Sequence, residues 1–308
     1  MASFLGPRGS GGDLVSGGRY VVGLIGSGIT GSLSPALHER EADELGLRYV
    51  YQILDLDVLG LGVQDTAMLV AEAKRLGFAG LNITHPCKQA IVSHLDELSE
   101  DAATLAAVNT VVFTGGRSIG YNTDWSGFAA GFSRNLGGAP RDDIVVLGAG
   151  GAGSAVAYAL LRLGVCRLTV VDVDSGRAER LVEGLHPVMT DGQTIVTGSP
   201  QDLKARLADA DGLVNATAVG MTPDPGTPLP PELLHPRLWV ADVVYRPLET
   251  PLLAYARRIG CRTLDGGGMV TYQAAEALRL ITGVTPDAER MYAHMRQLTS
   301  GGDSADHG

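Results

Sequence analysis

Cysteine is scarce in this sequence of 308 residues, and its spacing excludes two classes of protein. The three cysteines, Cys87, Cys166 and Cys261, stand far apart and form neither a CxxC pair nor the dense framework of a small disulfide-bonded domain. Free thiols persist in a reducing compartment. The sequence therefore predicts a cytoplasmic protein without structural disulfides.

Long hydrophobic runs are missing as well. No apolar stretch reaches the roughly 20 residues that a transmembrane helix needs. The first 18 residues are rich in Gly and Ser and lack the apolar core of a signal peptide. We therefore expect no membrane association, and we expect flexible tails at residues 1–18 and 301–308.

Positive charge is in short supply, because 24 Lys and Arg residues stand against 34 Asp and Glu residues and the formal net charge is −10. No basic stripe is present to replace phosphate counterions, so nucleic acid is not expected as a partner. A small anionic ligand would need local positive groups that overcome the overall field. The sequence leaves the oligomeric state open, with a homodimer as one option.

Metal-binding patterns are also lacking. Histidines such as His38, His85 and His94 form no ligand set with recognisable metal spacing, so no metal is expected. What the chain does have is 42 glycines, 45% hydrophobic and 19% charged residues, a composition typical of an α/β enzyme. Its length allows two domains, and β-rich runs that alternate with helical periodicity predict mostly parallel sheets covered by helices.

A glycine-rich stretch stands near the middle of the chain. The run IVVLGAGGAG places Gly148, Gly150 and Gly153 in the GxGxxG spacing between a predicted strand and a predicted helix at 155–163. In such a turn the first glycine permits the bend, the second admits a pyrophosphate and the third lets helix and strand pack closely. The helix N-terminus then offers free N–H groups to the phosphates. This pattern predicts a Rossmann-type dinucleotide site.

An acidic residue follows the next predicted strand, which covers 168–171. Asp172 lies 24 residues after Gly148, where a carboxylate accepts hydrogen bonds from both adenosine ribose hydroxyls and repels a 2′-phosphate. The sequence therefore predicts NAD as the cofactor. The expected cofactor contacts are Gly148, Gly150, Gly151, Ala152, Gly153, Ser154, Asp172, Arg177, Thr217, Val243 and Gly266.

Two serines precede the first predicted helix, which runs to about Glu44. Ser34 fits the N-cap position with Pro35 at the first helical position. Ser32 and Ser34 also place two hydroxyls at a helix N-terminus, which is a good seat for a carboxylate. Both interpretations of Ser34 stay open at this point.

Lysine is rare in this chain, since only Lys74, Lys88 and Lys204 occur among the 24 basic residues. Lys88 follows the strand expected at 78–83. Asn82 and Thr84 lie at the carboxyl end of this strand, where open α/β sheets bind ligands. A lysine in a cleft can exchange a proton near neutral pH, whereas an arginine cannot. Lys88 is therefore a candidate acid or base.

A predicted hairpin, 108–113 with 117–121, brings Asn109 close to the run GYNTD that ends at Asp124. Asp124 can cap the following helix or orient the lysine, and the local pattern leaves both roles open.

Farther along, Asn215–Met221 is a loop at a strand end and a candidate wall of the nicotinamide site. The strand at 238–244 leads to Tyr245, and Gln273 lies on the first turns of a long helix.

Together these residues resemble the shikimate dehydrogenase family. The matching runs, in the order of the family, are SLSPALH (32–38), GLNITHPCK (80–88), AVNTV (107–111), NTDWSGF (122–128), GAGGAG (148–153), NATAVGM (215–221), DVVYRPLETPLL (242–253) and MVTYQA (269–274). The resemblance implies a discontinuous substrate domain, 19–123 completed by helices at 269–300, and an NAD-binding Rossmann domain at 124–268.

The resemblance also implies roles for individual residues. Lys88 and Asp124 match the catalytic pair of the family. The matches to its substrate contacts are Ser32 and Ser34 for a carboxylate, Asn82, Thr84, Asn109 and Gln273 for ring hydroxyls, and Tyr245 close to the same pocket. A polyhydroxy acid needs such convergent polar groups, because an unmet buried partner costs about 1 to 3 kcal/mol.

The chain departs from the family at one place. NADP-dependent members carry Asn-Arg-Thr or a similar run after the second strand of the cofactor domain, whereas this chain has Asp172-Val-Asp174 and its nearest cation is Arg177. Carboxylates facing a phosphate dianion are unfavourable. The pattern is more similar to the NAD-dependent quinate/shikimate dehydrogenases.

The predicted reaction is reversible hydride transfer between shikimate or quinate and NAD, giving 3-dehydroshikimate or 3-dehydroquinate. A nearby carboxylate keeps a lysine protonated, so the chemistry is assigned to the Lys88–Asp124 pair and the microscopic base stays open. Alternatives are a shikimate-only biosynthetic enzyme, an aminoshikimate or aminoquinate dehydrogenase, a methylenetetrahydrofolate dehydrogenase and a non-catalytic ligand sensor. Ser34 bears on the first two, because some quinate-using relatives have threonine there.

Overall fold

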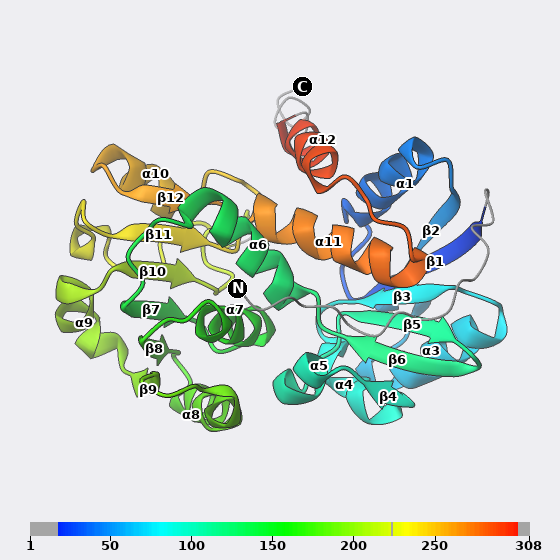
Figure 1. Ribbon diagram of the computed structural model, residues 1–308, viewed down its shortest axis with the longest axis horizontal. Coiled ribbons are helices and arrows are strands. Elements are labelled where there is room, and N and C mark those ends of the chain that lie inside the picture. Colours follow the sequence, from blue (N-terminus) through cyan, green and yellow to red (C-terminus); the bar gives the residue numbers. More distant parts are fainter. Residues whose placement is uncertain (1–17, 223, 301–308) are drawn as a thin grey trace.

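The computed structural model describes residues 18–222 and 224–300. It contains two six-stranded sheets that lie side by side, with helices on the faces of each (Figure 1). The predicted α/β fold is thereby confirmed. The predicted flexible tails lie outside the described residues, apart from Gly18.

The first sheet has the strand order β2-β1-β3-β5-β6-β4. Pairing is parallel between β1 and β2, β1 and β3, and β4 and β6, whereas β5 runs antiparallel to β3 and β6. The predicted hairpin is therefore present as β5 and β6. The strands are β1 (Arg19–Gly26), β2 (Arg48–Asp55), β3 (Gly80–Ile83), β4 (Glu97–Leu98), β5 (Thr110–Thr114) and β6 (Arg117–Tyr121).

Helices cover both faces of this sheet because its strands carry apolar residues on both sides. On one face the side chains of β3 pack with α3, α4 and α5, and on the other those of β1 pack with α1 and the far end of the long helix α11 (Gly267–Thr282). The helices of this part are α1 (Ser34–Glu44), α2 (Leu56–Leu59), α3 (Thr66–Arg75), α4 (Cys87–Ala90) and α5 (Glu100–Leu105).

The second sheet is wholly parallel, with the order β12-β11-β10-β7-β8-β9. In chain order of its strands this is 6-5-4-1-2-3, which is the Rossmann arrangement. The strand order reverses between β7 and β10, and ligands of such sheets bind at that switch point. The strands are β7 (Asp143–Leu147), β8 (Arg167–Val171), β9 (Thr194–Gly198), β10 (Gly212–Asn215), β11 (Trp239–Asp242) and β12 (Arg262–Leu264).

The central strand β7 explains the double covering of this sheet. Ile144 and Val146 are buried in one hydrophobic cluster with α6, α7 and α8, and Val145 and Leu147 are buried in another with α9 and α10. A strand buried on both faces requires this continuous apolar run. The helices are α6 (Asp124–Leu136), α7 (Gly151–Arg162), α8 (Ser175–Leu185), α9 (Leu203–Asp209) and α10 (Pro251–Arg258).

Two long helices connect the sheets. The helix α11 (Gly267–Thr282) crosses α6 and runs toward the first sheet, and α12 (Ala288–Ser300) follows it (Figure 1). The crossing is close because Gly127 of α6 has no side chain, and a Cβ there would lie 2.6 Å from the carbonyl oxygen of Met269. Met291 and Met295 of α12 are buried in one cluster with Leu37 of α1.

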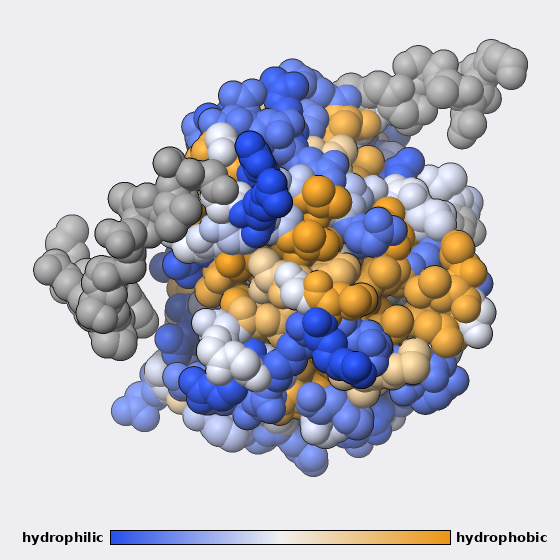
Figure 2. Space-filling view, turned by 90° about the vertical axis from the view of Figure 1, so that its right-hand side faces the viewer, coloured by the Kyte–Doolittle hydropathy of each residue, from blue (hydrophilic) through white to orange (hydrophobic). Residues whose placement is uncertain are grey.

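Part of the surface is hydrophobic. Figure 2 views the right-hand side of Figure 1 and shows hydrophobic residues gathered across the middle of this face. Exposed large hydrophobic side chains of the first sheet and its neighbouring helices are Val21, Val50, Val58, Leu59, Val63, Met68 and Leu76. Uncovered apolar areas commonly mark contact surfaces. Within residues 18–222 and 224–300, no helix has both the length and the apolarity needed to cross a membrane.

Candidate active site

A cavity of about 920 Å³ opens between the two sheets, and all seven predicted substrate residues line it. Its wall includes segments that leave the carboxyl ends of strands in both sheets, together with the start of α11. The predicted site residues on this wall are Ser32, Ser34, Asn82, Thr84, Lys88, Asn109, Asp124, Ala152, Val243, Tyr245 and Gln273. The structure therefore brings together side chains that are up to 241 positions apart in the chain.

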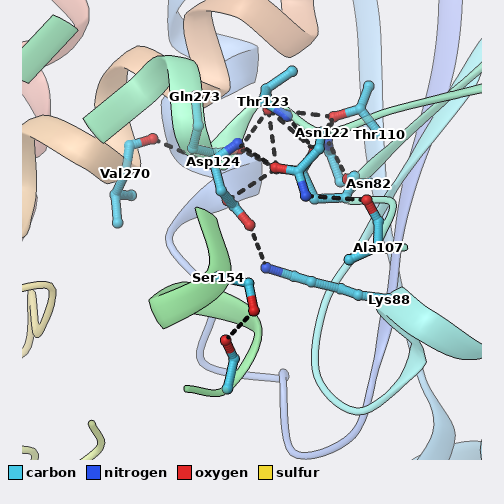
Figure 3. A network of polar contacts seen from close by, with 12 residues as sticks. Asn82, Lys88, Ala107, Thr110, Asn122, Thr123, Asp124, Ser154, Val270 and Gln273 are labelled. Atoms are coloured by element: carbon cyan, nitrogen blue, oxygen red, sulfur yellow. Dashed lines mark hydrogen bonds and ion pairs between the residues drawn. The ribbon is translucent and has the colours of Figure 1, made fainter. Parts of the chain in front are cut away.

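The predicted catalytic pair forms an ion pair. The Nζ atom of Lys88 lies 2.6 Å from Oδ2 of Asp124, and the lysine and aspartate side chains are 23% and 10% exposed (Figure 3). Lys88 comes from the short helix α4, and Asp124 is the first residue of α6. The pair thus joins a helix of the first sheet to the helix that leads into the second.

The capping role that the sequence left open for Asp124 is wrong. Thr123 holds the N-cap position of α6, and no side chain caps that helix. The carboxylate of Asp124 turns instead to Lys88 and to Asn109, whose Nδ2 donates to Oδ1 at 2.9 Å. A tertiary partner of opposite charge has outcompeted the local backbone for this carboxylate.

A network of amide and hydroxyl groups surrounds the pair (Figure 3). The Nδ2 of Asn109 also lies 3.4 Å from Oε1 of Gln273, and the hydroxyl of Thr123 donates to the same oxygen at 3.3 Å. Asn82 donates to Oγ1 of Thr110 at 3.1 Å. These contacts fix the orientation of each amide group on the cavity wall.

Sequence reasoning missed three members of this network: Thr110, Thr123 and Tyr51. Thr123 stands between residues of the NTD run that were singled out, but it was assigned no role. Tyr51 of β2 donates from its hydroxyl to Oδ1 of Asn82 at 2.8 Å and is also hydrogen-bonded to Ser34. Burial raises the pKa of Tyr51, so the hydroxyl is neutral and acts as a donor. The periodicity of a buried strand gave the only signal for this tyrosine.

The segment from Gly28 to Ser34, which carries the two serines and is called the serine loop below, is organised differently from the prediction. Leu33, not Ser34, is the N-cap residue of α1, and its helix has no side-chain cap bond. The N-cap prediction for Ser34 is therefore wrong by one position, because Ser34 is already helical. Its N–H donates to Oγ of Ser32 at 3.2 Å, which holds the two serines together.

A buried carboxylate that the sequence did not point to anchors this loop. Asp55, at the end of β2, accepts from the N–H groups of Gly28, Ile29 and Thr30 at 3.1, 2.7 and 3.0 Å. Burial alone would raise the pKa of Asp55, but its backbone donors outweigh burial and hold the pKa below its usual value. The charged form is therefore the one that organises the loop before Ser32.

The glycine loop, residues 148–153 between β7 and α7, has the geometry that a dinucleotide site needs. Gly148 has φ +96°, and a Cβ on Gly153 would overlap the carbonyl oxygen of Gly148. Gly150 is the N-cap residue of α7, and no side chain occupies its first N–H groups. Space for a phosphate is free here, since a Cβ on Gly150 or Gly151 would meet nothing within 4 Å. The residues present therefore fit a bound dinucleotide.

The acidic residue after β8 lies against this loop. Oδ2 of Asp172 accepts from the N–H of Ala149 at 2.7 Å, and Nη1 of Arg177 lies 3.8 Å from the same oxygen. Val173 is 96% exposed, and Asp174 caps α8 by accepting from the N–H of Arg177 at 3.1 Å. The carboxylate of Asp172 thus sits next to the phosphate-binding turn, and an uncharged side chain faces the solvent beside it.

Apart from Ala152 and Val243, the predicted cofactor residues do not line the 920 Å³ cavity. Thr217 donates to Oδ1 of Asn215 at 2.7 Å, and a Cβ on Gly266 would overlap the carbonyl oxygen of Val243. The residues in this group are Gly148, Gly150, Gly151, Gly153, Ser154, Asp172, Arg177, Thr217 and Gly266. Among the described residues, no group of three or more His, Cys, Asp or Glu side chains could hold a metal ion.

Comparison with known proteins gives three findings. A family model described as the shikimate dehydrogenase substrate binding domain matches residues 24–111. A shikimate dehydrogenase (NADP(+)) of Streptomyces avermitilis is 58% identical over 279 residues, covering 91% of this chain and 96% of the relative. A quinate/shikimate dehydrogenase (NAD(+)) of Corynebacterium efficiens is 46% identical over 280 residues, covering 90% and 98%.

Solved structures give the same picture. The quinate dehydrogenase of Corynebacterium glutamicum in complex with NAD superposes with a TM-score of 0.86 at 44% identity and covers 91% of this chain and 99% of that one. The shikimate 5-dehydrogenase of Listeria monocytogenes, in complex with shikimate and NAD, gives a TM-score of 0.81 at 31% identity, with 90% and 96% covered.

Proposed function

The chain belongs to the shikimate dehydrogenase family, and we propose that it catalyses reversible hydride transfer between NAD and a ring carbinol of shikimate or quinate. It is an oxidoreductase that uses a dinucleotide. The observation that carries the proposal is the Lys88–Asp124 ion pair, because it stands on the wall of a cavity shared by the serine loop and the start of the cofactor helix α7.

The substrate is proposed to bind with its carboxylate at Ser32 and Ser34 and its ring hydroxyls at the amide network. Asn82, Thr84, Asn109 and Gln273 line the cavity. Tyr245 also lines the cavity, from the segment that follows β11. Because the amides are already oriented by Tyr51, Thr110 and Thr123, they are preorganised for hydroxyls and lose little freedom on binding.

Lys88 and Asp124 would handle the proton. The bound nicotinamide supplies the hydride acceptor in the oxidation direction. As the hydride leaves, the hydroxyl proton must also leave, and the pair accepts it or relays it to water. Asp124 orients the lysine through the 2.6 Å contact, while Asn109 holds the second carboxylate oxygen. We assign this step to the pair as a unit, because the two groups are in direct contact through the ion pair.

NAD is the proposed dinucleotide. The relatives carry names with both cofactors, NADP(+) in Streptomyces avermitilis and NAD(+) in Corynebacterium, so the proposal rests on the residues of this chain. Asp172 is charged and lies beside the glycine loop, where a 2′-phosphate would be repelled. Val173 offers no charge to compensate for such a phosphate.

The two parts of the molecule are proposed to act as separate domains, 19–123 with 269–300 binding the substrate and 124–268 binding the cofactor. Closure of these domains over both ligands would exclude water from the hydride transfer. Crystals of the free protein and of the ternary complex test this proposal, and identical domain angles in the two would contradict it.

Initial rates with the purified protein test the function. Each of NAD and NADP is combined with each of shikimate and quinate at alkaline pH, and Lys88→Ala serves as the control. Turnover of both acids with NAD, feeble rates with NADP and an inactive variant are expected. Preference for NADP would contradict the role of Asp172, and turnover of shikimate alone would favour the biosynthetic alternative. If neither acid reacts, the amino analogues are the next substrates, and a ligand sensor would bind without turnover.

A further inference from the structure

An arginine bridges the cavity at the serine loop. Arg246 follows Tyr245 in the segment between β11 and α10 and lines the cavity. Its Nη1 donates to the carbonyl oxygen of Gly31 at 3.0 Å, although the two residues are 215 positions apart. Gly31 directly precedes Ser32, so this bond ties a segment of the second sheet to the loop that carries the proposed carboxylate seat.

The charge of this arginine is not cancelled by a carboxylate. Asp124 and Glu249 also line the cavity, but Asp124 pairs with Lys88 at 2.6 Å and Glu249 pairs with Arg257 at 2.7 Å. Within the described part of the chain, the neutral carbonyl of Gly31 is the hydrogen-bond partner of Arg246, and no carboxylate lies within ion-pair distance of its guanidinium. A positive charge therefore remains beside the serine loop.

We propose that Arg246 is a specificity-determining residue that selects substrates bearing a carboxylate. This inference rests on the proposed function and deepens it. A chain with net charge −10 repels anions at long range, and two serine hydroxyls supply only neutral donors. A guanidinium has five N–H donors and uses one on Gly31, so the others are available for charge-assisted bonds to a carboxylate. The bond to Gly31 also fixes the loop in place.

The test compares shikimate with its uncharged methyl ester in the wild type and in Arg246→Gln. The wild type is expected to prefer the acid, and the variant should reduce this preference, as the ratio of kcat/KM values, about tenfold, which corresponds to about 1.4 kcal/mol. The loss should appear as a higher KM for shikimate, with the KM for the ester and both kcat values changed by less than about twofold. Added salt should lower kcat/KM for shikimate more steeply in the wild type than in the variant.

Two further variants separate charge from shape. Arg258→Gln makes the same change in net charge on the exposed end of α10, outside the cavity. It should leave kcat and KM unchanged for both shikimate and its methyl ester. Arg246→Lys keeps the charge but loses the planar fork, so an intermediate preference is expected. Equal loss on acid and ester in Arg246→Gln would overturn the proposal, because it would show that the arginine only shapes the loop.

Failure of the proposed function would look different. If the wild type turns over neither compound with either dinucleotide, the hydride-transfer proposal fails, and calorimetric titration with shikimate then tests the selection by itself. Weaker binding of shikimate by about tenfold in Arg246→Gln supports it. Equal affinity of wild type and variant, or no binding to either, overturns it.

Discussion

The ammonium of Lys88 and the carboxylate of Asp124 meet at 2.6 Å across the boundary between the two sheets. Lys88 stands on a helix of four residues, and Asp124 opens the helix that leads into the nucleotide-binding half. Neither partner has a second charged partner in the described part of the chain, and Asn109 holds the other carboxylate oxygen. The ion pair therefore links Lys88, which belongs to the first sheet and its helices, to the first residue of α6, the helix that leads from the first sheet to the second.

Substituting the lysine separates proton transfer from orientation. Lys88→Arg keeps the positive charge but cannot give up a proton near neutral pH. We expect kcat to fall by about 100-fold or more in both Lys88→Arg and Lys88→Met, since positioned acid–base groups contribute roughly 10² to 10⁴. Steady-state kinetics on shikimate measure this, with Lys74→Met as a control that should keep full activity. A kcat within tenfold of wild type in Lys88→Arg would limit the lysine to orientation.

The preference between NAD and NADP should depend on Val173, the exposed residue that follows β8 by two positions. Val173→Arg places a cation beside the proposed ribose site, and because Val173 is 96% exposed the stability should change by no more than about 0.5 kcal/mol. The ratio of kcat/KM for NADP over NAD is expected to rise at least about tenfold, and further when Asp172→Asn is added. Val58→Arg, also exposed but on the first half, adds the same charge and should leave the ratio unchanged. An unchanged ratio in Val173→Arg would show that this position does not contact the cofactor.

The crossing of α6 and α11 gives a matched pair of glycine substitutions. A Cβ on Gly127 would lie 2.6 Å from the carbonyl oxygen of Met269, whereas one on Gly131 would find its nearest atom at 3.6 Å. We expect Gly127→Ala to lower the free energy of unfolding by about 1 to 3 kcal/mol and to raise KM by displacing Gln273. Gly131→Ala should be neutral or stabilising by up to about 1 kcal/mol. Urea denaturation measures both, and similar values for the two would contradict the packing argument.

Much of the fold and of the site could be predicted because the signals were local. Apolar runs such as Ile144–Leu147 identify strands buried on both faces, and the spacing of Gly148, Gly150 and Gly153 identifies the turn that follows. Parallel strands place their carboxyl ends at one edge, so Asn82, Thr84 and Lys88 could be expected near a ligand. The resemblance to a family then added Gln273 and Tyr245, which no local pattern marked.

The remainder depended on which strands pair and on which partner each polar group finds. Tyr51 reaches Asn82 only because β2 and β3 flank β1 in the sheet, an order that the sequence does not state. Ser34 and Asp124 both fit helix caps by local preference, yet neither caps a helix. Lys88 and Asn109 supply stronger partners to Asp124 than the backbone of its own helix does.

The C-terminal helix should depend on one buried carboxylate. Glu41 is 1% exposed and accepts from Nη2 and Nε of Arg290 at 2.7 and 2.9 Å and from the N–H of Asp287 at 2.7 Å. Arg290→Ala leaves this charge buried with only the backbone donor, so a loss of about 2 to 4 kcal/mol in the free energy of unfolding is expected. Arg40→Ala breaks an exposed pair with Glu44 and should cost less than about 0.5 kcal/mol. Comparable losses in the two variants would contradict the role given to Glu41.

A second buried carboxylate should make stability depend on pH. Asp242, 2% exposed at the end of β11, accepts from Asn215, from the hydroxyl of Thr250 and from the N–H of Val244. Burial raises the pKa of Asp242 to about 6, although these three donors act in the opposite direction. In the unfolded chain the value is about 3.9. The folded state therefore holds this proton more tightly than the unfolded chain does.

It follows that the contribution of Asp242 to stability is complete below about pH 4 and is lost as the pH rises through about 6. Asp242→Asn removes the titration and can keep the bonds, because the hydroxyl of Thr250 can turn to accept from the new amide. The free energy of unfolding of the variant minus that of the wild type should therefore increase by about 1 kcal/mol as the pH rises from 5 to 7.5. Urea denaturation at several pH values measures this difference, in which other titrating groups cancel. Asp96→Asn is the control, since Asp96 has its pKa lowered to about 2 by the N–H and hydroxyl of Ser118 and by Lys74, and its difference should stay flat over this range. A flat difference for Asp242→Asn as well would mean that its carboxyl is ionised throughout and that its three donors outweigh burial.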